Sequence, residues 1–209
     1  MQNLLDEIVK EVTDRVKKEI FIEVEASGRH VHLSEEDVEK LFGTGYKLTK
    51  IKDLSQPGQY ACKERVTIKG PKGSITNVVV LGPCRKETQV EISLTDGLSL
   101  GLKPPIKQSG DLQGTLGIKI STDKEEIELP RGLMVAKRHV HITKCDATKF
   151  NVNDNEIVKV KVFGQRPLIF DDVVVRVSDK YKTYMHIDYD EANACGFSKG
   201  TMAKIVKFY

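Results

Sequence analysis

The sequence predicts a mainly β protein with short helices, arranged as barrels or sandwiches in two related halves. Many short segments alternate apolar and polar residues between turns rich in glycine and proline, a pattern typical of barrels and sandwiches. The tetrapeptide Arg-His-Val-His occurs twice, at residues 29–32 and 138–141, which indicates two related halves. The 209 residues are enough for one large domain or two small ones, each with its own core.

The composition excludes several classes of protein. Charged residues make up 30% and hydrophobic residues 39% of the chain, as in ordinary globular proteins. A net charge of +3 is too small to indicate nucleic acid as a partner. There is no apolar run of transmembrane length and no signal peptide, so we expect a cytoplasmic protein without membrane association. We interpret the four cysteines, which form no C-x-x-C pair, as reduced thiols: Cys62, Cys84, Cys145 and Cys195.

Residues 3–19 are predicted to form an amphipathic helix. The apolar residues of this segment, together with the next residue, fall within an arc of about 160° at helical spacing. They are Leu4, Leu5, Ile8, Val9, Val12, Val16 and Ile20. The rest of the helix surface is charged, with Asp6, Lys10, Asp14, Lys17 and Lys18. The apolar stripe either packs on its own domain or docks on another protein.

The histidines are the chain's main candidates for chemistry. The chain has five, and the repeated tetrapeptide uses four of them. Val31 and Val140 favour strands, and on a strand the two imidazoles of each H-x-H project from the same face. Two neutral imidazoles on one face suit a metal ion such as zinc. The alternative is a polar face held by hydrogen bonds. The fifth histidine, His186, lies in a further strand pattern over 183–187.

Each histidine strand is expected to lead directly into a short helix. The capping pairs are Ser34 with Asp37, Thr143 with Asp146 and Asp188 with Glu191, and Gly43 and Gly196 end the first and last of these helices. Helix N-termini favour anions, which gives weak support for an anionic substrate.

The remaining segments read as strands and turns. Residues 54–59 fit a type II turn, with Pro57 and Gly58 at its centre. Over 88–94 the alternation places Glu91 on the polar face of a strand, opposite Val90, Ile92 and Leu94. The other expected strands are 21–25, 65–69, 74–81, 115–120, 125–129, 157–163, 168–170, 173–177 and 203–208.

Several of these segments together resemble the PduL-type phosphate propanoyltransferases, from about residue 21 to the C-terminus. The shared motifs are SGRHVHLS at 27–34, LSQPGQ at 54–59, GPCRKETQVE at 82–91, SDKY at 178–181 and MHID at 185–188. The resemblance implies two small β-barrels capped by short helices, with chain exchange between them. It also implies interconversion of a short-chain acyl-CoA (propanoyl-CoA or acetyl-CoA) and phosphate with acyl phosphate and CoA. Two adjacent metal ions are implied, zinc or another divalent transition metal.

The same resemblance implies roles for particular residues. One metal would be held by His30, His32 and Glu91, and the other by His139, His141 and His186. Arg85 would bind phosphate, which suits a planar guanidinium. Ser27, Gly28, Lys72 and Asn193 are the candidates for CoA contacts. This chain has Gly28 and Cys84 where members of the family often have asparagine and alanine, and Val79 where some members have a basic residue.

The resemblance also suggests an organisation and partners. We expect an N-terminal helix over residues 1–20, one barrel from 21–28 with 137–209, and a second barrel from 29–136. Some family members carry an N-terminal segment that directs them into bacterial microcompartments, so residues 3–19 are a candidate contact with shell proteins. The apolar stripe also makes a homo-oligomer plausible.

Two mechanisms and three other functions remain as alternatives. Phosphate could attack the thioester directly at the metal pair, or Cys84 could form an acyl-enzyme. The other functions are a bicupin-like metalloenzyme, a binuclear hydrolase and a non-enzymatic zinc protein associated with a shell.

Overall fold

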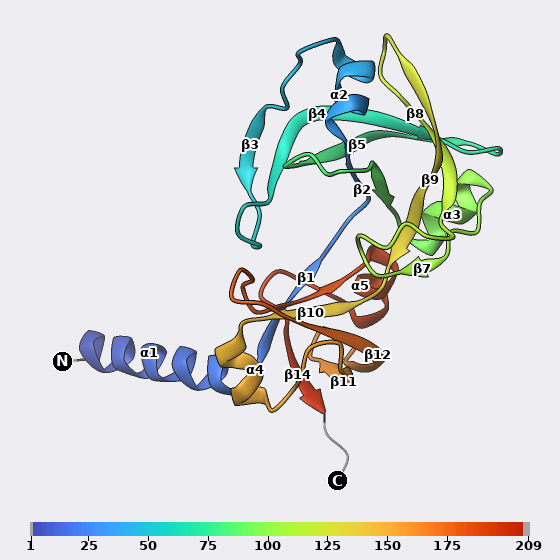
Figure 1. Cartoon of the computed structure of the whole chain (residues 1–209). Helices are drawn as coiled ribbons and strands as arrows, with labels where there is room; N and C mark the ends of the chain where they lie inside the picture. The colour runs from blue at the N-terminus through green and yellow to red at the C-terminus, as the bar shows by residue number, and fades with distance from the viewer. Residues whose placement is uncertain (1, 207–209) are drawn as a thin grey trace. The chain divides into compact units, whose positions relative to one another are not determined.

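The computed structural model describes residues 2–206, without the side chains of residues 2–4, 14, 15, 17 and 18, and shows a mainly β chain (Figure 1). The helices are α1 (Gln2–Ile20), α2 (Glu35–Phe42), α3 (Leu94–Leu100), α4 (Lys144–Phe150) and α5 (Tyr189–Cys195). The strands are β1 (Ile22–Ala26), β2 (His30–His32), β3 (Lys50–Asp53), β4 (Tyr60–Lys69), β5 (Ser74–Gly82), β6 (Gln89–Glu91), β7 (Ile106–Lys107), β8 (Leu116–Ser121), β9 (Glu126–Ala136), β10 (His139–Ile142), β11 (Ile157–Val162), β12 (Leu168–Val177), β13 (Tyr184–Ile187) and β14 (Met202–Val206).

The chain divides into two compact units that exchange strands. Of the described residues, unit 1 comprises 2–26, 138–187 and 191–206, and unit 2 comprises 27–137 and 188–190. Strand β1 precedes β2 in the sequence but belongs to unit 1, and β9 precedes β10 but belongs to unit 2. Each Arg-His-Val-His segment is therefore preceded by a strand of the other unit.

Each unit contains a closed β-barrel. In unit 1 the strand order is β1-β13-β10-β12-β11-β14. In unit 2 the order β4-β5-β2-β6-β9 is closed by β8, which pairs with both β9 and β4, while β3 and β7 lie outside the ring on β4 and β9. The prediction of two β-barrels with short helices and an N-terminal helix is confirmed.

The two barrels share one topology. In each, the H-x-H strand pairs in parallel with one neighbour (β2 with β5, β10 with β12) and antiparallel with the other (β2 with β6, β10 with β13). That antiparallel neighbour then pairs in parallel with the next strand, β6 with β9 and β13 with β1. The repeated tetrapeptide therefore marks a duplicated fold.

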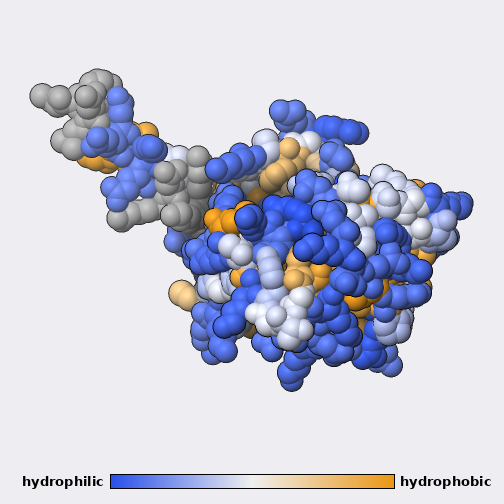
Figure 2. Space-filling model, turned by 90° about the horizontal axis from the view of Figure 1, so that it is seen from above, coloured by the Kyte–Doolittle hydropathy of each residue, from blue (hydrophilic) through white to orange (hydrophobic). Residues whose placement is uncertain are grey.

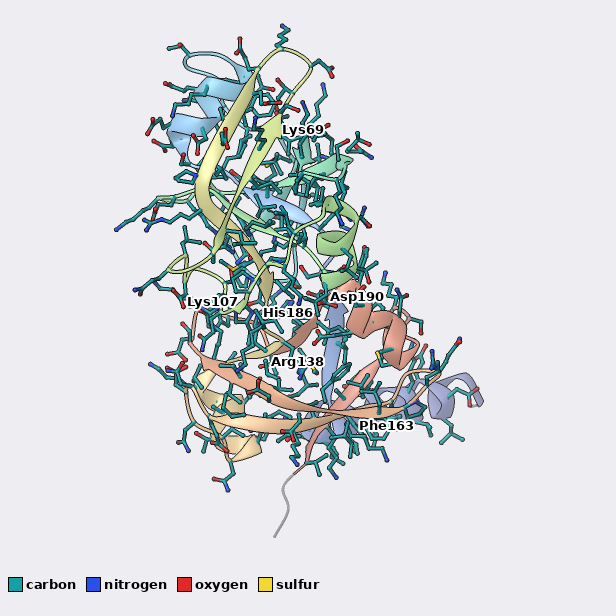
Figure 3. The ribbon with its side chains drawn as sticks, turned by 90° about the vertical axis from the view of Figure 1, so that its right-hand side faces the viewer. Lys69, Lys107, Arg138, Phe163, His186 and Asp190 are labelled. Carbon is teal, nitrogen blue, oxygen red and sulfur yellow. The ribbon has the colours of Figure 1, made fainter. Side chains whose placement is uncertain are left out.

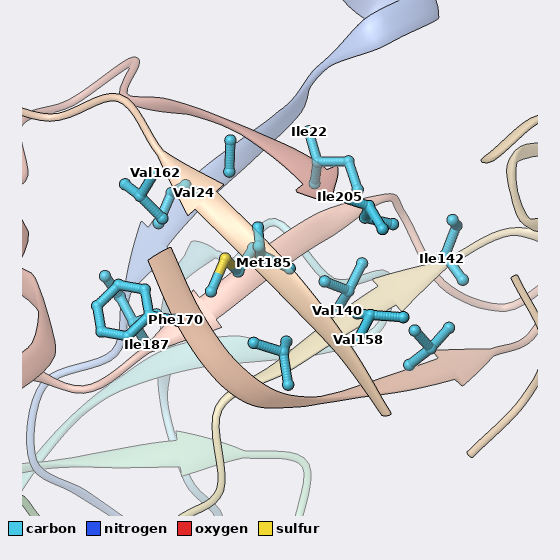
Figure 4. Close-up of a cluster of buried hydrophobic side chains, with 14 of the residues drawn as sticks. Ile22, Val24, Val140, Ile142, Val158, Val162, Phe170, Met185, Ile187 and Ile205 are labelled. Atoms are coloured by element: carbon cyan, nitrogen blue, oxygen red, sulfur yellow. The ribbon is translucent and has the colours of Figure 1, made fainter. Parts of the chain in front are cut away.

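Strand alternation separates the core of each barrel from its histidines. In unit 1 Val140, Ile142, Met185 and Ile187 are buried in the hydrophobic core shown in Figure 4. In unit 2 Val31 and Val90 belong to the corresponding core. Because neighbouring side chains on a strand face opposite ways, the residues between these core positions project from the outer face of the barrel.

The capped helices after the H-x-H strands form as predicted. Ser34 caps α2 by accepting a hydrogen bond from Asp37 N–H, and Thr143 caps α4 by accepting one from Asp146 N–H. Gly43 ends α2 and donates its N–H to Glu39. Helix α5 follows β13, also as expected.

Some predicted strands were wrong in extent. The strand expected over 88–94 ends at Glu91, because Ser93 and Asp96 form a capping box that starts α3. The two strands expected over 168–170 and 173–177 are the single strand β12, with an irregularity near Asp172, whose φ is 55°. Of the last predicted strand, 203–208, residues 207 and 208 lie outside the described part of the chain.

Helix α1 confirms the predicted helix, and its described apolar side chains lie outside both cores. Leu5, Val9 and Val12 are 52%, 61% and 54% exposed. Figure 2 shows hydrophobic atoms among hydrophilic ones on this helix. The prediction also placed Leu4, Asp14, Lys17 and Lys18 on the two faces of this helix, but their side chains lie outside the described part of the structure. Within residues 2–206, none of the helices combines the length and apolar character needed to cross a membrane.

Candidate active site

The first cluster comprises His30, His32 and Glu91, on the adjacent strands β2 and β6 of unit 2. The antiparallel register places His30 opposite Glu91. All three side chains are buried, and one ligand atom of each lies within 4.8 Å of the others. His30 Nδ1 lies 2.8 Å from the carbonyl oxygen of Gly28, and His30 Nε2 lies 3.5 Å from Glu91 Oε2. His30 Nε2 and Glu91 Oε2 are therefore close enough to bind the same ion.

Electrostatics in this cluster favour a bound cation. Burial lowers the pKa of His30, but the Glu91 carboxylate and the hydrogen bond to the Gly28 carbonyl together outweigh burial and raise this pKa above its usual value. Burial alone would raise the pKa of Glu91, but the neighbouring His30 and His32 and the hydrogen bond from Ser109 hold it well below its usual value. Burial, His30 and Arg85 together hold the pKa of His32 well below its usual value. The cluster thus combines an ionised carboxylate with a neutral imidazole.

The second cluster comprises His139, His141 and His186, on β10 and β13 of unit 1. The register places His139 opposite His186, and their rings stack with centroids 5.1 Å apart. The three ligand atoms lie within 4.8 Å of one another. Burial lowers the pKa of His141 to about 3, and His139 and Arg176 act in the same direction. His141 is therefore neutral at neutral pH, which is the form that binds metals.

The two clusters are versions of one arrangement. In both, the antiparallel partner strand places a third side chain opposite the first histidine of the H-x-H: Glu91 on β6 and His186 on β13. One unit therefore offers two imidazoles and a carboxylate, and the other offers three imidazoles. The structure brings together within each unit the ligand groups that the resemblance implied.

A duplicated hydrogen-bond network holds the helix starts beside both clusters. Thr88 accepts a hydrogen bond from Ser34 N–H at 2.9 Å and donates to Asp37 at 2.5 Å. In unit 1 Thr183 accepts from Thr143 N–H at 3.3 Å and donates to Asp146. Sequence reasoning found the caps but missed both threonines, whose partners are distant in sequence.

The arginine of each repeat also has a matching partner. Arg29 forms an ion pair with Asp96 at 3.1 Å, and Arg138 forms one with Glu191 at 2.6 Å. Arg138 and His186 are labelled in Figure 3. These pairs tie the chain just before each H-x-H strand to helix α3 or α5.

Arg85 lies beside the first cluster. Its backbone N–H donates to Leu33 at 2.9 Å, next to the H-x-H strand. Its guanidinium lies 2.8 Å from His32 Nε2 and donates to Ser109 Oγ at 3.2 Å. Arg85 and His32 line a cavity of about 320 Å³, large enough for roughly ten water molecules at about 30 Å³ each. The other lining residues are Pro57, Gly58, Gln59, Gly82, Pro83 and Cys84.

The four candidate CoA contacts occupy different parts of the chain. Ser27 and Gly28 lie between β1 and β2, and Gly28 accepts the hydrogen bond of His30. A side chain at position 28 would collide with Tyr189, since an added Cβ would lie 2.8 Å from its ring. Lys72 is exposed in the turn between β4 and β5, and Asn193 is exposed on α5 of unit 1.

The residues present fit metal ions. The hydrogen bond between His30 Nδ1 and a backbone carbonyl leaves Nε2 on the opposite side of the ring as the ligand atom, as in metal-ligating histidines. Among the described residues, the buried Nδ1 atoms of His32 and His141 have no hydrogen-bond partner. A buried polar atom without a hydrogen-bond partner or a bound ligand lowers the stability of the fold by about 1–3 kcal/mol. Two histidines with a glutamate, and three histidines, are both ligand sets of catalytic zinc sites.

Comparison with known proteins identifies the family of the chain. A family model described as phosphate propanoyltransferase matches residues 23–198. The chain is 80% identical to the phosphate propanoyltransferase of Clostridioides difficile over 99% of both chains. It is 60% identical to that of Listeria monocytogenes, over 98% of this chain and 96% of the relative. It is 54% identical to that of Thermotoga maritima over 96% of both chains. The chain therefore belongs to the phosphate propanoyltransferase family, a family of acyltransferase enzymes.

Proposed function

We propose that this enzyme transfers a propanoyl group between coenzyme A and phosphate at a pair of metal ions, one in each cluster. The observation that carries the proposal is the guanidinium of Arg85 beside His32 of the first cluster, because it combines an anion-binding group with metal ligands. Bound there, zinc or another divalent transition metal would polarise the thioester carbonyl and accept the thiolate of CoA.

The chain's own residues have distinct tasks in this reaction. Arg85 binds phosphate through two parallel N–H groups and aims one phosphate oxygen at the thioester carbon. A carbon–oxygen bond forms, the carbon–sulfur bond breaks, and CoA leaves as a thiolate. Ser27, Gly28, Lys72 and Asn193 are our proposed contacts to CoA, and acetyl-CoA is a second proposed substrate.

The proposal is tested by thiol release from propanoyl-CoA with and without phosphate. We expect CoA release that requires both phosphate and bound metal, and the same assay with acetyl-CoA measures the second substrate. Release of CoA without phosphate would indicate a binuclear hydrolase. Two bound metals without any release would indicate a structural zinc protein. A bicupin-like enzyme is disfavoured because helices α2 and α4 begin directly after the H-x-H strands.

Cys84 is expected to be dispensable for turnover. It is half-buried in the cavity wall beside Arg85, and burial raises the pKa of its thiol, which lowers its nucleophilicity at neutral pH. Cys84→Ala should retain kcat within about threefold of wild type, since direct attack needs no acyl-enzyme. Steady-state kinetics with propanoyl-CoA measure this, and Cys145→Ala is the control at an exposed cysteine. A loss of turnover confined to Cys84→Ala, with a rapid burst of CoA in wild type, would indicate a covalent step.

Helix α1 is our proposed contact with shell proteins of a bacterial microcompartment in the cytoplasm, and with further copies of the chain. Deleting residues 3–19 should leave kcat unchanged, because its described apolar side chains lie outside both barrel cores. The deletion should release the enzyme from purified shells, measured by co-sedimentation. Replacing Val9 and Val12 by serine keeps the helix length and should have the same effect on shells. Loss of folding on deletion would instead show that the helix packs on its own unit.

A further inference from the structure

The buried side chain of Gln89 has both ends of its amide in hydrogen bonds. It lies on β6, two residues before Glu91, and is 1% exposed. Its Oε1 accepts a hydrogen bond from Gly110 N–H at 2.8 Å. Its Nε2 donates to Glu91 Oε1 at 2.5 Å and to Ser109 Oγ at 3.0 Å. The amide thus ties β6 to the segment between β7 and β8.

These hydrogen bonds make the two oxygens of Glu91 unequal. Oε1 accepts hydrogen bonds from Gln89 Nε2 and from Ser109 Oγ, the latter at 2.8 Å. Oε2 is the oxygen that faces His30 Nε2. Because two donors already engage Oε1, the carboxylate presents Oε2 as its ligand atom. Without these donors it could rotate and present either oxygen or both.

Ser109 links this carboxylate to Arg85. Its Oγ donates to Glu91 and accepts a hydrogen bond from the Arg85 guanidinium at 3.2 Å. Ser109 accepts a hydrogen bond from Gln89, and the next residue in the chain, Gly110, donates its N–H to the same amide. The Gln89 amide is therefore hydrogen-bonded to the Glu91 carboxylate and is linked through Ser109 to the guanidinium of Arg85.

Unit 1 provides an internal comparison. Tyr184 holds the position there that Gln89 holds in unit 2, since Gln89 is opposite His32 and Tyr184 is opposite His141. The third ligand in unit 1 is the imidazole of His186, which has no pair of oxygens to distinguish. The glutamine side chain is therefore present in the unit whose third ligand is a carboxylate, and it is replaced by tyrosine in the unit whose third ligand is an imidazole. This pattern indicates a role toward Glu91 rather than a general need of the fold.

We propose that Gln89 is a positioning residue that directs Glu91 Oε2 toward the metal and, through Ser109, holds Arg85 in the phosphate site. The effect on Arg85 rests on the proposed function. The effect on the orientation of Glu91 can be measured as metal affinity, without turnover. Removing a partner of a metal ligand typically lowers metal affinity or activity by about 10–100-fold.

The main test compares Gln89→Met with wild type. Methionine has a similar length but no amide, so it removes the hydrogen bonds while filling the space. We expect the affinity for one of two zinc ions to fall about 10–100-fold in competition with a chromophoric chelator. We also expect the KM for phosphate to rise more than the KM for propanoyl-CoA. Unchanged affinity for both zinc ions would overturn the proposal.

Controls separate positioning from loss of folding. Thr115→Val removes another buried hydrogen-bonding side chain of unit 2, which bonds Leu112 and Gly132, and should leave metal affinity unchanged. In a Glu91→Ala background Gln89→Met should have no further effect on metal affinity, and a full additional effect would contradict action through Glu91. If Gln89→Met does not fold, Ser109→Ala tests the same link at a half-buried position, and unchanged zinc affinity there would overturn the proposal.

The readouts also separate this inference from the proposed function. If wild type shows no phosphate-dependent CoA release but Gln89→Met still weakens one zinc site, the proposed function fails and the metal part stands. If wild type is active and the variant keeps both zinc affinities, the inference alone fails.

Discussion

Arg85→Lys should lower the kcat/KM for phosphate by about 10²–10³-fold. Lysine keeps the positive charge but cannot make two parallel hydrogen bonds to one phosphate, and the loss of one oriented donor to a developing charge costs about this much. The measurement is initial-rate CoA release at fixed propanoyl-CoA and varied phosphate.

Arg131→Lys is the matched control for this change. Arg131 is also in unit 2, but it is exposed and paired with Glu87 at 2.5 Å. We expect its kinetic constants to stay within about twofold of wild type, because exposed ion pairs contribute little. An Arg85→Lys enzyme with unchanged dependence on phosphate would contradict the role of Arg85.

Glu91→Gln and His141→Gln should each remove one metal ion per chain and lower kcat by more than about 100-fold, beyond the typical effect of outer-shell partners. Each substitution removes one of three ligands from a different cluster. Glutamine is isosteric with glutamate but neutral, so Glu91→Gln removes mainly the charge. Metal content is measured by elemental analysis after dialysis, and kcat by CoA release.

Glu87→Gln is the control on the neighbouring surface, since Glu87 is exposed and bound to Arg131. We expect two metals and normal turnover for this variant. Loss of one metal without loss of activity, in either cluster variant, would show that the corresponding site is structural.

Local sequence patterns predicted the parts of the fold that depend on neighbouring residues. The period-two pattern placed the imidazoles of each H-x-H on one face, and short-range capping pairs predicted where α2 and α4 begin. Helix α3 was missed because Val90, Ile92 and Leu94 continue the strand alternation. Ser93 and Asp96 form a capping box that was readable in the sequence and could have revealed the helix.

Other features depend on long-range contacts that the sequence does not display. The strand β3 is exposed throughout and β7 has two residues, so neither carries an apolar pattern. The hydrogen bonds of Thr88 to Ser34 and of Gln89 to Gly110 join residues 54 and 21 positions apart. Glu91 and His186 entered the prediction as metal ligands through the family resemblance, whereas the register that places Glu91 opposite His30 came from the structure.

The most direct test of the central claim is a zinc titration of metal-free enzyme, followed by propanoyl-CoA cleavage with and without phosphate at each point. If the two clusters act together, activity should appear mainly with the second equivalent of zinc and should require phosphate throughout. Activity that is complete at one equivalent of zinc, or that persists without phosphate, would contradict a two-metal phosphate acyltransferase.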